Sequence, residues 1–95
     1  MSSRFSGFNG DAVLEHEMAG EAAANLGRMG GRVTTTLAAL KAANADARPA
    51  ALDDAVRAVW YYFIQREACG QRDHREAIAL YAIPREVLGR LGTVR

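Results

Sequence analysis

Apolar side chains recur every three or four residues through the first half of the chain. The pattern starts after Asp11, a suitable N-cap residue, and no proline interrupts it before Pro49. Such spacing places the side chains on one side of an α-helix. The positions are Val13, Leu14, Met18, Ala22, Leu26, Met29, Val33, Leu37 and Leu40. We therefore predict one helix of about 50 Å, ended by turn-forming residues 44–49.

Three glycines, Gly27, Gly30 and Gly31, lie in the middle of this predicted helix. Each costs about 1 kcal/mol relative to alanine in a helix. Either the helix breaks here, or the glycines allow another element to approach closely. The apolar stripe keeps its phase across them, which favours a continuous helix that bends at most.

A second helix is predicted over residues 50–68, followed by Gly70 in the position that commonly ends a helix. If it folds back antiparallel across the 44–49 turn, Phe63 lies opposite Gly31 and Glu67 lies opposite Gly27. An aromatic ring against glycine is close packing of large against small, which would explain the glycines.

Two shorter helices are predicted in the last quarter of the chain. Asp73 is a suitable N-cap for a helix over residues 74–81, with Glu76 at the capping-box position. Pro84 breaks the pattern and can begin a helix over residues 85–91, which Gly92 would end. The sequence thus predicts an all-α fold, a long helical hairpin plus two short C-terminal helices. Residues 1–9 are predicted to be a flexible tail and residues 10–95 a single helical domain.

The run Val59-Trp60-Tyr61-Tyr62-Phe63-Ile64 is apolar all round its helix and leaves no clean solvent side. A chain of 95 residues has little material to cover it. The first half of the long helix also has no partner within the hairpin. We therefore predict a homo-oligomer, a two-fold dimer in which the hairpins form a four-helix bundle. The residues expected in the core or the oligomer interface are Val59, Trp60, Phe63, Ile64, Leu14 and Met18.

Composition narrows the classes of function without selecting one. The net charge is +1, which demands neither nucleic acid nor an anionic membrane as a partner. The single cysteine, Cys69, fits a reducing compartment. The start of the chain lacks the apolar segment of a signal peptide. No uninterrupted apolar run is longer than residues 58–64, too short to span a bilayer. We expect a cytoplasmic protein that does not enter the membrane.

A metal site is one alternative. Acidic and metal-ligating residues near the end of the second helix can approach others on the first, and carboxylates with histidine bind metals in helical bundles. The candidate ligands are His16, Glu17, Glu21, Glu67, Cys69, Asp73 and His74. Their spacing lacks a Glu-x-x-His or His-x-x-x-His pair. Asp73 as a helix cap and Glu67 as an ion-pair partner are the simpler interpretation, so we expect neither a metal nor another cofactor.

Two further chemistries are weakly indicated. Cys69 and His74 could form a thiolate–imidazole pair, but a helix C-terminus disfavours a thiolate, and a small buried residue at a turn is the simpler interpretation of Cys69. The glycine-rich stretch of residues 27–32 lacks the preceding strand and the Lys-Ser/Thr of a phosphate-binding loop. We predict that the protein is not an enzyme.

Residues 77–90 (AIALYAIPREVLGR) resemble the two-helix core of helix-turn-helix DNA-binding domains. Ala82 stands where that motif usually has glycine. The resemblance implies DNA contacts from Arg85, Glu86 and Arg90 at the second helix. The near-neutral chain argues against it, because phosphate contacts dominate DNA affinity. A helical corner packed on the first helix is the favoured interpretation, so nucleic acid is a possible but not preferred partner.

A longer stretch resembles a family of small uncharacterised bacterial proteins. The residues that carry the resemblance are WYYFIQREACG at 60–70, Arg72-Asp73-His74 and Tyr81-Ala82-Ile83-Pro84. The resemblance implies no activity. The function that we expect is therefore a non-catalytic, oligomeric interaction or structural module whose partner is an unknown protein. A DNA-binding regulator and a metal-binding bundle are the alternatives.

Overall fold

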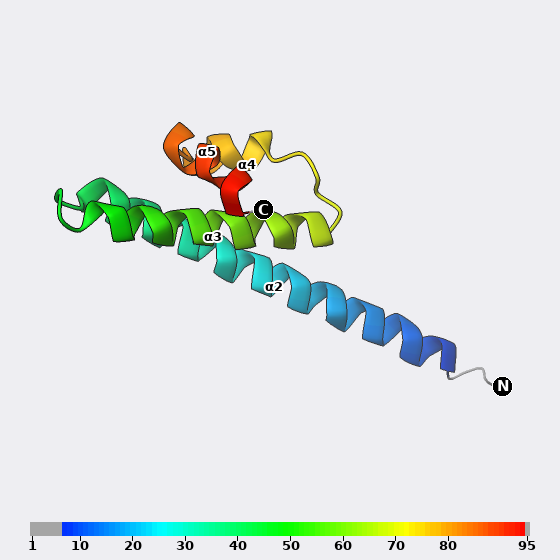
Figure 1. Cartoon of the computed structure of the whole chain (residues 1–95). Helices are drawn as coiled ribbons and strands as arrows, with labels where there is room; N and C mark the ends of the chain where they lie inside the picture. The colour runs from blue at the N-terminus through cyan, green and yellow to red at the C-terminus, as the bar shows by residue number, and fades with distance from the viewer. Residues whose placement is uncertain (1–6, 95) are drawn as a thin grey trace.

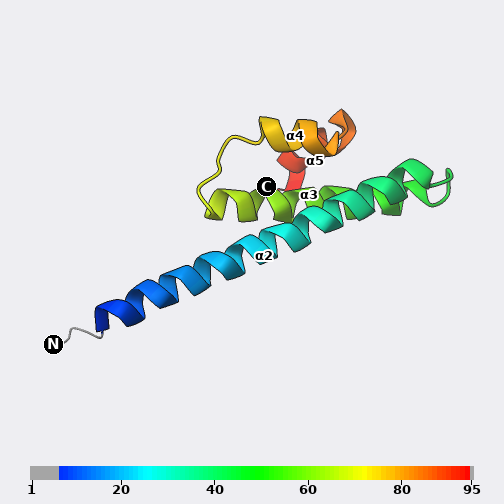
Figure 2. The ribbon, with the colours of Figure 1, turned by 180° about the vertical axis from the view of Figure 1, so that it is seen from behind.

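The computed structural model describes residues 7–94 and confirms the all-α class. These residues form four helices, α2 (Gly7–Ala42), α3 (Arg48–Ala68), α4 (Arg75–Tyr81) and α5 (Arg85–Val94), and no strand. α2 and α3 form an antiparallel hairpin, and α4 and α5 lie together on one side of it (Figures 1 and 2). The first half of α2 extends alone beyond the end of α3 (Figure 1).

The element boundaries follow local sequence signals, with small differences from prediction. α2 is continuous through Gly27 and Gly31, so those residues do not form a phosphate-binding loop. α3 begins at Arg48 because proline is tolerated in a first helical turn. Gly70 has φ 88° and ends α3, as predicted. α5 continues past Gly92 to Val94, because one glycine weakens a helix without stopping it.

The predicted tail overlaps the first helix. Residues 7–9 belong to α2, and no proline in that stretch prevents the helix from extending backwards. Residues 1–6 lie outside the described residues. α4 begins at Arg75, one residue later than predicted, so its N-cap is His74 and the prediction of Asp73 as the N-cap is wrong. Asp73 Oδ1 still accepts a hydrogen bond from the Arg75 backbone N–H at 3.0 Å. Asp73 therefore satisfies a backbone donor at the start of α4.

The core lies between α2 and α3 and beneath α4 and α5. Its buried members include Val33 and Leu40 from α2, Val59 and Phe63 from α3, and Val87 from α5. The molecule measures 67 × 21 × 20 Å and its radius of gyration is 18.1 Å. A compact domain of this length would have a radius of about 12 Å. The excess arises from the projecting half of α2.

The predicted packing of aromatics against glycines occurs at a different glycine. Gly31 and Gly27 are exposed, and a Cβ added at either meets nothing within 4 Å. Gly30 is buried instead, beneath Tyr81 of α4 and Tyr62 of α3. The predicted pairings of Phe63 with Gly31 and of Glu67 with Gly27 are therefore wrong. One residue turns a helix by about 100°, so Gly30 and Gly31 point in different directions.

Candidate interaction surface

The aromatic run of α3 divides between the core and the surface. Val59, Tyr62 and Phe63 are buried and Trp60 is half-buried. Tyr61 and Ile64 are 47% and 38% exposed. The run is therefore not covered all round within one chain. The remaining open apolar surface lies at Tyr61 and Ile64.

Trp60 lies at the boundary between the core and the surface. Its ring meets the Tyr61 ring edge-on, with centroids 5.0 Å apart. Its indole Nε1 is buried and has no hydrogen-bond partner among the described residues. Leaving a buried donor unpaired costs about 1–3 kcal/mol. Packing around the rest of the indole must outweigh that cost.

The projecting half of α2 carries two exposed large apolar side chains. Leu14 is 57% exposed and Met18 is 59% exposed. They continue the apolar stripe that is buried at Val33 and Leu40, where α3 covers it. The stripe therefore loses its cover where α2 passes the end of α3.

His74 is the centre of a contact network at the end of α3. Its ring stacks on Phe63, with centroids 4.1 Å apart and planes at 4°. Arg66 Nε donates to His74 Nδ1 at 3.2 Å, and His74 Nε2 lies 2.8 Å from Glu67 Oε2. An Nδ1 that accepts from Arg66 leaves the proton on Nε2, which then donates to Glu67. Both ring nitrogens are thus engaged, so His74 does not pair with Cys69.

Arg66 also anchors the loop before α4. Its Nη2 donates to the Asp73 backbone carbonyl at 3.0 Å. The sequence had not singled out Arg66 for this role, because contacts across seven or eight residues through an irregular loop have no periodic signal. The network fixes the loop between α3 and α4 and exposes no reactive group.

The proposed metal ligands do not converge. No group of three or more His, Cys, Asp or Glu side chains suited to a metal exists in the part of the chain that the structure describes. Glu67 and His74 bond to each other, while His16, Glu17 and Glu21 lie exposed on the projecting half of α2. Asp73 pairs with Arg75 at 2.6 Å, and its hydrogen bonds to Arg75 lower the pKa of Asp73 to about 2.

Cys69 is exposed, which corrects the prediction of a buried residue at a turn. It is the C-cap residue of α3, and the Gln65 Nε2 donates a hydrogen bond to the Cys69 sulfur at 3.8 Å. The turn that Gly70 begins leads the chain away from α3, which leaves the thiol exposed.

Two of the three proposed DNA-contacting residues bind α3 instead. Glu86 accepts two hydrogen bonds from the Arg48 guanidinium, at 3.0 and 2.6 Å. Hydrogen bonding with Arg48 lowers the pKa of Glu86 below its usual range. Arg90 lies 3.3 Å from Asp53. Val87 and Leu91 are buried, so α5 packs on α3. The third proposed contact, Arg85, is exposed and forms no ion pair within residues 7–94.

A hollow of about 470 Å³ lies where the end of α2 meets the turn between α4 and α5. Leu37, Leu40 and Tyr81 contribute apolar walls, while Lys41 and Arg48 contribute charge. Arg48 is already paired with Glu86. The hollow therefore has no converging set of unpaired polar groups that would define a ligand.

The comparisons with known proteins place the chain in a family. Residues 5–95 match the model of a family of unknown function, DUF6665. The chain belongs to this family. The bacterial origin that the sequence resemblance implied stays a prediction. No curated protein and no solved structure matches the chain. Within residues 7–94 no helix is both long enough and apolar enough to cross a membrane.

Proposed function

We propose that this DUF6665 protein is a non-catalytic helical module that acts by binding other proteins, and that it first binds a second copy of itself. The observation that carries the proposal is the projecting half of α2, where Leu14 and Met18 are 57% and 59% exposed. A contiguous apolar stripe without cover on a projecting helix is typical of an interaction surface.

The absence of catalysis is part of the proposal, and the arrangement of the reactive side chains supports it. A nucleophilic cysteine needs a base that is oriented towards it. The nitrogens of His74 are directed to Arg66 and Glu67, and Cys69 is exposed at the C-terminus of α3. Elemental analysis of the purified protein tests the metal-binding alternative. Stoichiometric zinc, iron or manganese that a His74→Ala variant loses would overturn the proposal.

Sedimentation velocity at tens of micromolar tests the association. We expect a species of twice the chain mass of 10.3 kDa. A Leu14→Glu/Met18→Glu variant should sediment as a monomer, because two carboxylates would be buried in an apolar contact. Leu80→Glu is the matched control, since Leu80 is 76% exposed but lies on α4. A monodisperse wild-type species of 10.3 kDa would refute self-association.

The salt dependence of binding distinguishes the DNA-binding alternative from the protein-interaction module. Binding through several phosphates weakens steeply as salt is added. We expect no micromolar binding to random duplex DNA at low salt, because Glu86 and Arg90 are held by Arg48 and Asp53. Micromolar binding that disappears at higher salt, and in an Arg85→Ala/Arg90→Ala variant, would favour a regulator over the protein-interaction module.

A further inference from the structure

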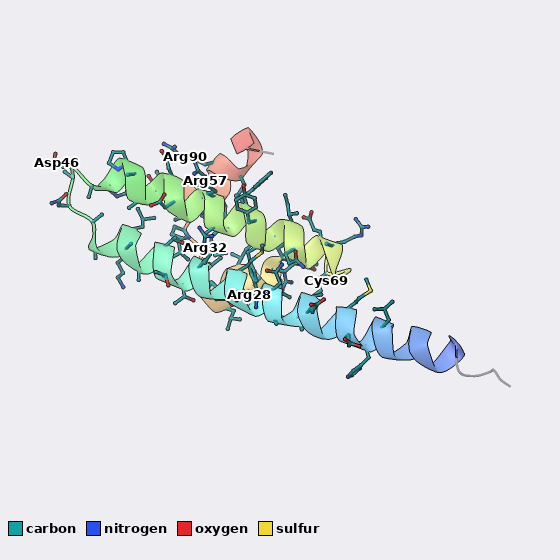
Figure 3. The ribbon with its side chains drawn as sticks, turned by 90° about the horizontal axis from the view of Figure 1, so that it is seen from below. Arg28, Arg32, Asp46, Arg57, Cys69 and Arg90 are labelled. Atoms are coloured by element: carbon teal, nitrogen blue, oxygen red, sulfur yellow. The ribbon has the colours of Figure 1, made fainter. Side chains whose placement is uncertain are left out.

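One side of the α2–α3 hairpin is open. α4 and α5 cover the other side, where Tyr81 packs on Gly30. Arg32 lies two residues after Gly30, about 200° further round α2, and so points away from Tyr81. Figure 3 looks onto the open side and labels Arg28 and Arg32 on α2 and Arg57 on α3. A small cavity of about 40 Å³ lies there, lined by Met29, Arg32, Ala58 and Tyr61.

Charge is segregated along α2. The stretch from Gly7 to Gly27 contains Asp11, Glu15, Glu17 and Glu21 but no lysine or arginine. Every lysine and arginine of the chain except Arg4 lies at position 28 or later. The projecting half of α2 is therefore acidic, while the hairpin that follows carries the arginines. The projecting half of α2 and the hairpin are therefore complementary in charge. They cannot meet within one chain, because α2 is one continuous helix and cannot fold back on itself.

The acidic and basic residues share one side of α2. The positions at alternating spacings of four and three are Leu14, Met18, Glu21, Asn25, Arg28 and Arg32, the pattern that lets two helices pack along their length. All are exposed except Asn25, which is half-buried. In two antiparallel copies of α2 centred between residues 24 and 25, Glu21 lies opposite Arg28 of the second copy. Glu17 lies opposite Arg32 in the same register.

We propose that a second copy of this chain packs antiparallel across the open side of the hairpin. The acidic half of its α2 lies against Arg28 and Arg32, and its Met18 covers the cavity lined by Met29, Arg32, Ala58 and Tyr61. Each copy covers the projecting half of the other, so the contact closes as a two-fold dimer. This arrangement rests on the proposed self-association and adds its partner, orientation and register.

Cross-linking of the full chain tests the orientation. In a Cys69→Ser background, Leu14→Cys and Thr36→Cys chains are mixed and bridged with a short bis-maleimide. Each chain then carries a single cysteine, so a bridge can form only between two chains. We expect cross-linked dimers in the mixture and none in either variant alone. Dimers from Leu14→Cys alone would show parallel packing and overturn the proposal.

Charge reversal tests the register. Glu17→Arg/Glu21→Arg should weaken dimerisation at least about tenfold by placing like charges opposite each other. Adding Arg28→Glu/Arg32→Glu to the same chain should restore it. Arg72→Glu/Arg85→Glu is the control for the rescue, with the same charge change as Arg28→Glu/Arg32→Glu but at exposed residues outside α2, and it should not restore dimerisation. If the wild type dimerises and the Glu17→Arg/Glu21→Arg variant dimerises equally well, this register is refuted while self-association stands. If the wild type is monomeric, the proposed function is refuted as well.

Discussion

Gly30 of α2 lies directly beneath the phenol ring of Tyr81. A Cβ built on Gly30 would overlap Tyr81 Oη and would lie 3.3 Å from Tyr81 Cζ and 3.6 Å from Tyr62 Cε1. The two tyrosine rings meet edge-on, with centroids 5.4 Å apart, so Tyr81 has little freedom to move. Glycine at position 30 therefore allows α4 to dock on the hairpin.

Gly30→Ala should destabilise the protein by about 1–3 kcal/mol, since overpacking exceeds the gain in helix propensity. Gly31→Ala is the matched control, because its Cβ meets nothing within 4 Å. It should stabilise by up to about 1 kcal/mol. Urea denaturation of both variants measures the difference. Equal effects of the two substitutions would contradict the packing of Tyr81 on Gly30.

Phe63→Ala should cost about 3–5 kcal/mol, because the ring is buried and leaves a cavity. Phe63 is 2% exposed and stacks on His74. Tyr61→Ala is the comparison from the same helix, where the side chain is 47% exposed. It should cost about 1 kcal/mol or less at a protein concentration where the chain is monomeric. A small effect of Phe63→Ala would place Phe63 outside the core.

Asp73 and Glu86 should make stability fall in acid. Hydrogen bonding with Arg75 and with Arg48, respectively, lowers the pKa of each carboxyl, to about 2 for Asp73. A carboxyl with a lowered folded-state pKa stabilises the protein above its unfolded pKa, and the contribution is lost as pH falls through the folded value. We expect unfolding midpoints to decline below about pH 4, and less so in Asp73→Asn. Carboxyl NMR showing an ordinary pKa for Asp73 would contradict its pairing with Arg75.

His74 should be the Nε2–H tautomer when neutral. Arg66 Nε donates to Nδ1, which leaves Nε2 to donate to Glu67. Nitrogen-15 NMR of the imidazole distinguishes the two tautomers. Arg66→Gln should shift the population towards a mixture, while Arg72→Gln should not, because Arg72 is exposed in the loop between α3 and α4. A proton found on Nδ1 in the wild type would rule out the Arg66 contact.

The positions of the four helices are largely determined by local sequence signals. The apolar stripe, the absence of proline before Pro49, the turn at Gly70 and the break at Pro84 predict four helices close to those observed. These signals are local, because helix formation and termination depend on neighbours within a turn or two. The exposed Leu14 and Met18 also follow from sequence, since α2 is 36 residues long and α3 only 21.

The pairing of side chains between the elements was decided by the tertiary structure. Gly30 rather than Gly31 meets an aromatic ring, and that ring belongs to Tyr81 of α4, which counting residues across the hairpin could not find. Glu86 and Arg90 bind α3, so α5 packs on the hairpin rather than presenting those side chains outward. Contacts between helices depend on rotations of about 100° per residue and on side-chain volumes distant in sequence. Periodicity therefore predicts which side of a helix is apolar, while packing selects the residue that it meets.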